Sequence, residues 1–291
     1  METALAIDIG ATKMAAGVVD ASGHLLARVE VATPDSASGG QLFDQLVELI
    51  ERLKPFDGFV CCGVGCPGPM SSDGEQVSPL NISALHGLPL AEQLRQVTGL
   101  PCKVGHDAKA LALAEGWVGA AIGVPNYLAM VVSTGIGSGI VLNGNLLEGG
   151  AGNAGHIGQM VVASPGRPLA AHCPGSLESE ASGTAIAAHT GHPACEASTA
   201  VVAQTGTLVG RAAGSVANLL DLRLVLVAGS VALGFGEPFF AAAQAEMDRI
   251  CVLDFTTGAR IEPAGCGDEG PLIGAAAYGF RAVGTSVLPS R

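Results

Sequence analysis

The sequence is poor in charged and aromatic residues. Of 291 residues, 14% are charged and 4% are aromatic, with one tryptophan and two tyrosines. Hydrophobic residues make up 48% of the chain, which excludes a disordered protein and predicts a large core or a buried subunit interface. Positive charge is scarcest, because 14 Lys and Arg face 26 Asp and Glu and leave a net charge of -12. This charge would repel the phosphates of DNA and RNA, so no nucleic-acid partner is expected.

Long apolar runs are also missing. The run 222–235 is interrupted by Gly229, Ser230 and Gly234, and no run approaches the ~20 residues that span a bilayer. Residues 1–9 pass almost directly into a strand-like segment, without the basic start and apolar stretch of a signal peptide. We therefore expect a cytoplasmic protein with no membrane anchor. Eight cysteines are present, and because cytosolic disulfides are rare we expect Cys61, Cys62 and Cys66 to be core residues.

The length favours two domains rather than one, since single cores stop growing beyond about 250–300 residues. The hydrophobic pattern predicts strands at 5–9, 15–20, 24–31, 59–65 and 102–105, and helices at 41–53, 90–97 and from Asp107. The second half begins in the same way, with a strand at 127–132, a glycine loop at 133–139, a strand from Ile140 and a turn at 143–145. This internal repeat indicates two related α/β halves. Chance similarity between two strand-turn-strand units is the alternative.

Two glycine-rich segments follow apolar strands and are candidates for binding phosphate. Residues 8–13 read Asp-Ile-Gly-Ala-Thr-Lys, so Asp8 ends a strand and Gly10 lets backbone N–H groups approach phosphate oxygens. Residues 133–139 read Ser-Thr-Gly-Ile-Gly-Ser-Gly and offer hydroxyl and amide donors. A glycine-rich hairpin turn explains each segment equally well, and neither has the P-loop spacing. Gly229, which follows the apolar run 224–228, could leave room for an adenosine or could simply form a tight turn.

Asp107 lies at the junction between a predicted strand and an Ala- and Leu-rich helix. A helix N-cap is the structural explanation, because Asp fills that position well. Beside phosphate-binding loops, the same carboxylate could instead accept a hydroxyl proton during phosphoryl transfer.

In their order along the chain these motifs resemble the ROK family of sugar kinases and related repressors, over about residues 5–279. The resemblance implies an α/β protein with the actin-like ATPase (ribonuclease H-like) fold, in which two duplicated α/β domains surround a cleft. It implies boundaries at 1–118 for an N-terminal domain with sugar and phosphate contacts, and at 119–270 for a C-terminal domain that binds nucleotide and dimerises. Residues 271–291 would form a C-terminal helix that packs back on the first domain. The repressors carry a DNA-binding segment ahead of the first phosphate motif, and only seven residues precede Asp8, so the kinase branch is expected.

By the same resemblance Asp107 is the catalytic base, and ATP with Mg²⁺ is the phosphoryl donor, with Asp8 holding the metal through water. The implied nucleotide contacts are Asp8, Gly10, Thr12, Lys13, Ser133, Thr134, Gly135, Gly137 and Gly229. The implied sugar contacts are Gly68, Asn81, His106, His156, Gln159 and Glu178.

Several positions depart from the family pattern. His106 and His156 stand where Asn and Glu are usual, and His156 resembles the bacterial N-acylmannosamine kinases, which favours N-acetylmannosamine as substrate. The positions of the family's structural zinc carry Gln159, Leu169, Ala171 and Ser176, and we expect no structural zinc because Leu and Ala have no donor atom. His172, Cys173 and Cys195 could in principle form a substitute, although their spacing fits no zinc pattern.

The sequence thus predicts a homodimeric kinase that transfers the γ-phosphate of ATP to the 6-hydroxyl of a hexose or an N-acylhexosamine. A glucokinase is the nearest alternative. The altered histidines leave open a non-catalytic sugar or nucleotide sensor on the same fold, and a structural ATPase of the actin class is a third possibility.

Overall fold

The computed structural model describes residues 2–34, 38–53, 58–71, 73–79, 82–169 and 172–288. The chain divides into two units that are each built on a five-stranded sheet. The first unit comprises Met1–Gly123, Leu146–Ala154 and Cys266–Arg291, and the second comprises Val124–Asn145 and Gly155–Gly265. A short segment from the middle of the chain, 146–154, therefore belongs to the unit that is otherwise built from the two ends of the chain.

The sheet of the first unit has the order β3-β2-β1-β4-β5. Its antiparallel part and its parallel part meet at β1, and the strands are β1 (Thr3–Ile9), β2 (Lys13–Asp20), β3 (Leu25–Ala32), β4 (Phe59–Cys66) and β5 (Cys102–His106). Asp8 pairs with Gly65, and Gly65 pairs with Gly105, so the carboxyl ends of β1, β4 and β5 share one edge. Asp107 follows β5 directly and therefore starts at this edge.

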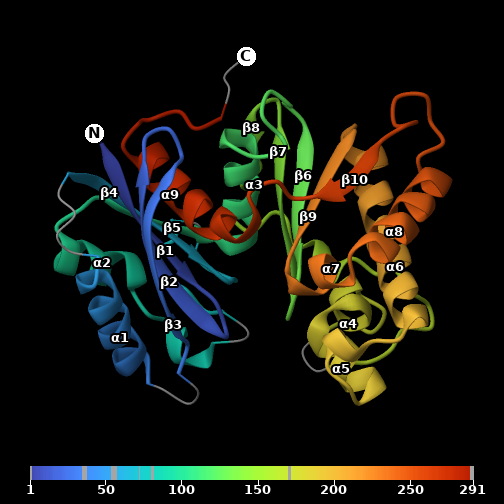
Figure 1. Ribbon diagram of the computed structural model, residues 1–291, viewed down its shortest axis with the longest axis horizontal. Coiled ribbons are helices and arrows are strands. Elements are labelled where there is room, and N and C mark those ends of the chain that lie inside the picture. Colours follow the sequence, from blue (N-terminus) through green and yellow to red (C-terminus); the bar gives the residue numbers. More distant parts are fainter. Residues whose placement is uncertain are drawn as a thin grey trace. The chain divides into compact units, whose positions relative to one another are not determined.

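Two layers of helices cover this sheet (Figure 1). Leucines of α1 (Gly39–Glu51) and α2 (Leu90–Thr98) pack in one core with alternate residues of β1 and β4. The helices α3 (Asp107–Trp117) and α9 (Gly270–Ala282) contact each other and the sheet on its other side. Close packing of α9 on β4 depends on Gly63, where an added Cβ would overlap the carbonyl oxygen of Ala275.

The second unit repeats the topology of the first. Its order is β10-β9-β6-β7-β8, with strands β6 (Tyr127–Val132), β7 (Ile136–Leu142), β8 (Asn145–Leu146), β9 (Leu224–Ala228) and β10 (Arg260–Pro263). In both sheets the first strand forms an antiparallel pair with the second and a parallel pair with the fourth. The predicted internal repeat of two related α/β halves is confirmed.

One predicted boundary in the second unit is wrong. We expected a loop at 133–139 and a strand from Ile140, but β7 already begins at Ile136. Gly137 and Gly139 pair with Val131 and Ala129 of β6, so these glycines are ladder residues. Only residues 133–135 form the turn between the two strands.

The helices of the second unit are α4 (Leu177–Ala181), α5 (Gly183–Thr190), α6 (Thr199–Leu220), α7 (Ser230–Phe235) and α8 (Glu237–Ile250). The long helices α6 and α8 pack on each other, and α8 also contacts β10 (Figure 1). Short 3-10 turns complete the chain: η1 (Ser83–Leu85), η2 (Ile157–Gln159), η3 (Ala194–Glu196) and η4 (Gly267–Glu269).

Cys61, Cys62 and Cys66 are buried and unpaired, which confirms their prediction as core residues. Among the residues that the structure describes, no helix has the length and apolar character needed to cross a membrane.

Candidate active site

Two aspartates meet at the carboxyl edge of the first sheet. Asp8 is the penultimate residue of β1, and Asp107 is the first residue of α3. Gly65 of β4 lies between them, since a Cβ built on it would be 3.4 Å from Asp8 Oδ1 and 3.6 Å from the Cα of Asp107. The absence of a side chain at residue 65 therefore leaves room for both aspartates at this edge.

The environment of Asp8 disfavours its negative charge. Burial, followed by the charge of Asp107, raises the pKa of Asp8 from 3.8 to about 7. Lys13 and Arg28 lower the pKa but offset only part of this effect. An added cation at this edge would favour the ionised carboxylate, so the chemistry of these residues fits a divalent metal bound with phosphate.

Asp107 is not the N-cap residue of α3. The N-cap residue is His106, without a side-chain cap bond, and Asp107 is already helical. Its Oδ1 accepts a hydrogen bond of 2.7 Å from the N–H of the next residue, Ala108. The carboxylate is therefore held at the start of the helix, beside the positive end of the helix dipole.

The turn between β1 and β2 has an ordered backbone. Gly10 N–H donates to Lys13 O at 2.9 Å, and Gly10 O accepts from Thr33 Oγ1 at 2.7 Å. The side chains of Thr12 and Lys13 are exposed, and Lys13 Nζ lies 3.9 Å from Glu30 Oε2. The hydrogen bonds that hold the turn do not use the side chains of Thr12 and Lys13, so both side chains can reach an external anion.

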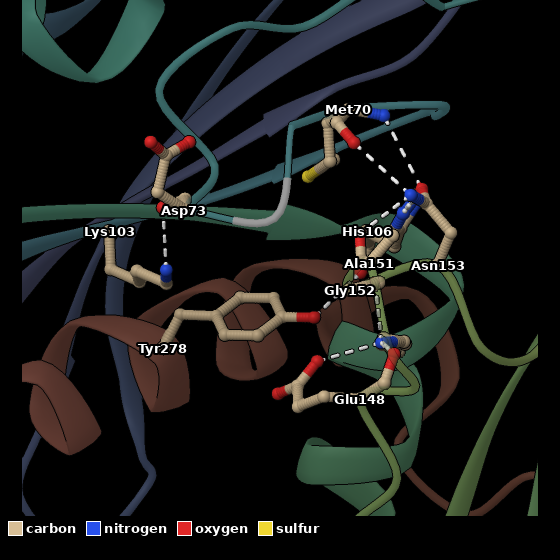
Figure 2. A network of polar contacts seen from close by, with 10 residues as sticks. Met70, Asp73, Lys103, His106, Glu148, Ala151, Gly152, Asn153 and Tyr278 are labelled. Carbon is tan, nitrogen blue, oxygen red and sulfur yellow. Dashed lines mark hydrogen bonds and ion pairs between the residues drawn. The ribbon is translucent and has the colours of Figure 1, made fainter.

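His106 is buried in a polar network of the first unit (Figure 2). Its Nε2 lies 2.9 Å from Asn153 Oδ1, and its carbonyl accepts a hydrogen bond of 3.1 Å from Tyr278 Oη. The ring packs against Gly68, where any Cβ would overlap it. The structure thus brings together two of the predicted sugar residues, Gly68 and His106, with the catalytic candidate Asp107.

A buried lysine is part of the same network. The Lys109 side chain is 1% exposed, and its Nζ lies 2.7 Å from Glu148 Oε2. It also donates to the carbonyls of Glu148 and Gly152, at 3.2 Å and 2.8 Å. Lys109 therefore ties segment 146–154 to the first turn of α3.

In the second unit, the predicted phosphate turn lies beside the start of α7. Ser133 N–H donates to Gly135 O at 3.0 Å, and Ser133 Oγ lies 2.9 Å from Ser230 Oγ. Gly229 has a φ of 102° and is so close to Val132 that no other residue fits without strain. Gly229 and the turn 133–135 are thus neighbours, as a site that holds one nucleotide with both would require.

Glu178 supports the same turn from α4. Its Oε2 accepts the N–H of Ile136 at 3.0 Å, and a Cβ on Gly135 would be 3.3 Å from its Oε1. His172 Nε2 lies 3.4 Å from Glu178 Oε1, while Gln159 Nε2 donates to His172 Nδ1 at 3.1 Å. Gln159, His172 and Glu178 therefore form a row of polar contacts.

The remaining predicted site residues have varied surroundings. His156 is exposed and precedes η2, next to Gly155, whose carbonyl accepts two hydrogen bonds from Ser138. Asn81 and Ala171 lie outside the described residues. In the described part of the chain, no group of three or more His, Cys, Asp or Glu has the arrangement of a metal site.

Sequence reasoning missed Lys109, Asn153, Ser230 and Tyr278. Lys109 had a signal, because it is the single cation in a helix rich in Ala and Leu, and such a residue is buried only with partners. Asn153 had no such signal, since its partners His106 and Met70 are 47 and 83 residues away in the sequence.

Comparison with known proteins shows similarity to one family along nearly the whole chain. The profile of the family described as "ROK family" matches residues 4–280. An N-acetylmannosamine kinase of Yersinia pseudotuberculosis serotype O:1b is 36% identical over 256 residues, which cover 81% of this chain and 86% of that protein.

Solved structures of ROK proteins are also similar to this chain. A ROK hexokinase from Thermus thermophilus has a TM-score of 0.83 and 30% identity, and the match covers 97% of this chain and 99% of that one. A ROK glucokinase from Streptomyces griseus, solved with glucose and AMPPNP, has a TM-score of 0.83 and 25% identity over 96% of this chain and 99% of that one.

Proposed function

This chain belongs to the ROK family and is a sugar kinase, and we propose that it transfers the γ-phosphate of ATP to the 6-hydroxyl of N-acetylmannosamine. Its fold is the actin-like ATPase fold, as the resemblance implied. The choice of sugar is supported by the 36% identity to a named N-acetylmannosamine kinase and by His156, which stands where most of the family has Glu. Glucose is the competing substrate, because a glucokinase is among the structural relatives.

The observation that carries the mechanism is the pair Asp8 and Asp107 on either side of Gly65. We assign Asp107 as the base, because its carboxylate is fixed by Ala108 N–H at the carboxyl edge of the first sheet and could accept the proton of a sugar hydroxyl. Gly68, Asn81, His106, His156, Gln159 and Glu178 are the residues we propose for binding the sugar. Their role is to hold the 6-hydroxyl in line with the γ-phosphate, and alignment of this kind accounts for much of the rate in phosphoryl transfer.

For the nucleotide, the two glycine turns are the proposed phosphate contacts. Gly10, Thr12 and Lys13 would provide them from the first unit, and Ser133, Thr134, Gly135 and Gly137 from the second, while Gly229 leaves room for the adenosine. Asp8 is the residue that fits Mg²⁺, through water, because its carboxylate lacks sufficient positive charge nearby. When bound, Mg²⁺ would neutralise charge on the phosphate oxygens.

The first test is ADP release from the purified protein with MgATP. N-acetylmannosamine, N-acetylglucosamine, glucose, mannose and a blank without sugar are compared in parallel. We expect the largest kcat/KM with N-acetylmannosamine, and at least about tenfold discrimination, since one pocket contact contributes ~1–3 kcal/mol.

Each other outcome points to a different function. A preference for glucose would establish a glucokinase. Release that does not depend on sugar would indicate an ATPase, and sugar binding without release would indicate a sensor.

We also propose a cytoplasmic homodimer. The second unit exposes Leu219, Val252, Leu253 and Phe255. Asn218 donates a hydrogen bond to Ile250 O and accepts one from Thr256 Oγ1, and these bonds bring the segments that carry the exposed side chains together. An apolar patch of this kind favours association. Sedimentation equilibrium should give twice the chain mass of 28.9 kDa, and Leu219→Asp should shift the protein towards monomer. A wild-type monomer at micromolar concentration would refute this, and cell fractionation tests the location.

A further inference from the structure

Asn153 connects three parts of the first unit that are far apart in sequence (Figure 2). Its Nδ2 donates to Met70 O at 3.2 Å and to Ala151 O at 2.8 Å. Its Oδ1 accepts from Met70 N–H at 3.4 Å and lies 2.9 Å from His106 Nε2. One amide group therefore holds the turn that follows Gly68 against the residue that precedes Asp107.

The two carbonyl partners define the orientation of this amide. Because Met70 O and Ala151 O can only accept, the atom that faces them must be the NH₂ group. Oδ1 then faces His106, and the hydrogen bond requires a proton on Nε2 of the imidazole. Asn153 thus selects one tautomer of His106, and in the neutral ring Nδ1 is the acceptor.

The position of Asn153 is itself fixed from α3. Lys109, two residues after Asp107, binds Glu148 and the carbonyl of Gly152, the residue before Asn153. A buried ammonium with three oxygen partners is costly to displace. Segment 148–153 is therefore anchored to the helix that carries the proposed base.

We propose that Asn153 is a positioning residue for the kinase reaction, which sets the spacing between the sugar-binding turn at Gly68 and the pair His106–Asp107. This inference rests on the proposed function, because it assigns a reaction role to that turn and to that pair. Asn153 touches no reacting atom in this assignment. It acts through the backbone of Met70 and the ring of His106, so its loss would misplace the sugar hydroxyl relative to Asp107.

The test compares Asn153→Ala with wild type and with the control Asn218→Ala. Asn218 is a partly buried asparagine of the second unit that donates to Ile250 O at 3.1 Å and accepts from Thr256 Oγ1 at 2.7 Å, and it lies outside the proposed site. For Asn153→Ala we expect kcat/KM for the sugar to fall about 10- to 100-fold, with a raised sugar KM and an ATP KM within twofold. The control should keep both KM values, because a loss of stability alone reduces the folded fraction and does not alter substrate affinity.

A double-mutant cycle with His106→Asn isolates the link to the imidazole. We expect the reduction in kcat/KM of the double variant to differ clearly from the product of the reductions in the two single variants, since each substitution removes the same hydrogen bond. If Asn153→Ala does not fold, the milder Asn153→Ser is assayed at a temperature well below its Tm.

Sugar kinetics within twofold of wild type for the Asn153 variant, or an equal loss in the Asn218 control, would overturn the inference. So would fully multiplicative losses in the cycle. Failure of the proposed function is distinguishable, because wild type would then show no ADP release that depends on a sugar.

Discussion

Replacement of Asp107 with asparagine is expected to lower kcat by about 10²- to 10⁴-fold, the range typical for loss of a general base. Asparagine has the same size and keeps an oxygen that can accept the N–H of Ala108, so the start of α3 should remain intact. The sugar KM should therefore change little, and the loss should lie in turnover. Steady-state ADP release with the preferred sugar measures both quantities.

The matched control for this variant is Asp44→Asn on the exposed side of α1. It makes the same chemical change away from the site and should retain wild-type kinetics. Near-full turnover by Asp107→Asn would exclude Asp107 as the base and would favour catalysis by alignment alone.

Replacement of Asp8 with asparagine should have opposite effects on activity and stability. The pKa of Asp8 in the folded protein is about 7, above the value of 3.8 for an unperturbed carboxyl. The folded state therefore binds the proton of the Asp8 carboxyl more tightly than the unfolded state does. The contribution of this proton to the free energy of unfolding is fully present below pH 3.8 and is lost as the pH rises through about 7. At pH 8 without divalent cations, Asp8→Asn should raise the free energy of unfolding by on the order of 1–3 kcal/mol.

The measurement is thermal unfolding of both proteins at pH 4 and pH 8, with and without MgATP. At pH 4 the two proteins should have nearly equal Tm values, because wild-type Asp8 is then mostly neutral. At pH 8 MgATP should stabilise wild type more than the variant, and the variant should lose at least about 10²-fold in kcat/KM. A lower Tm for Asp8→Asn at pH 8 would contradict the description of Asp8 as a buried, under-compensated carboxylate.

The strands of the first unit and its helices α1, α2 and α3 were predictable from sequence, because most of them are apolar runs bounded by turn signals. Strand β4, predicted at 59–65, is observed at Phe59–Cys66, and the helix predicted at 90–97 is Leu90–Thr98. The start of β7 was not predictable in this way. Gly137 and Gly139 have no side chain to show the alternation of a strand, and only their pairing with β6 reveals them as strand residues.

A residue of the candidate site was predictable where the sequence around it carries a local signal. It was not predictable where its role depends on contacts that only the fold creates. Asp8 and Asp107 each carry a local signal at the end of a strand. The link from Asn153 to His106 and Met70 depends on contacts over 47 and 83 residues, which no periodicity encodes. The row formed by Gln159, His172 and Glu178 is of the same kind, since polar residues in irregular segments show no pattern until they meet.

The origin of the first unit from separated parts of the chain affects its synthesis on the ribosome. Strands β1 and β4 emerge early, but the helix that covers one side of them, α9, comes from Gly270–Ala282. At typical elongation rates of about 5–20 residues per second, the part of that side on which α9 packs stays uncovered for roughly 10–40 seconds. Over this time it exposes apolar residues such as Ala4 and Ala6, which are fully buried in the finished protein. The amino-terminal unit is thus begun first and completed last, and a nascent chain that stalls before Gly270 would be a natural client for chaperones.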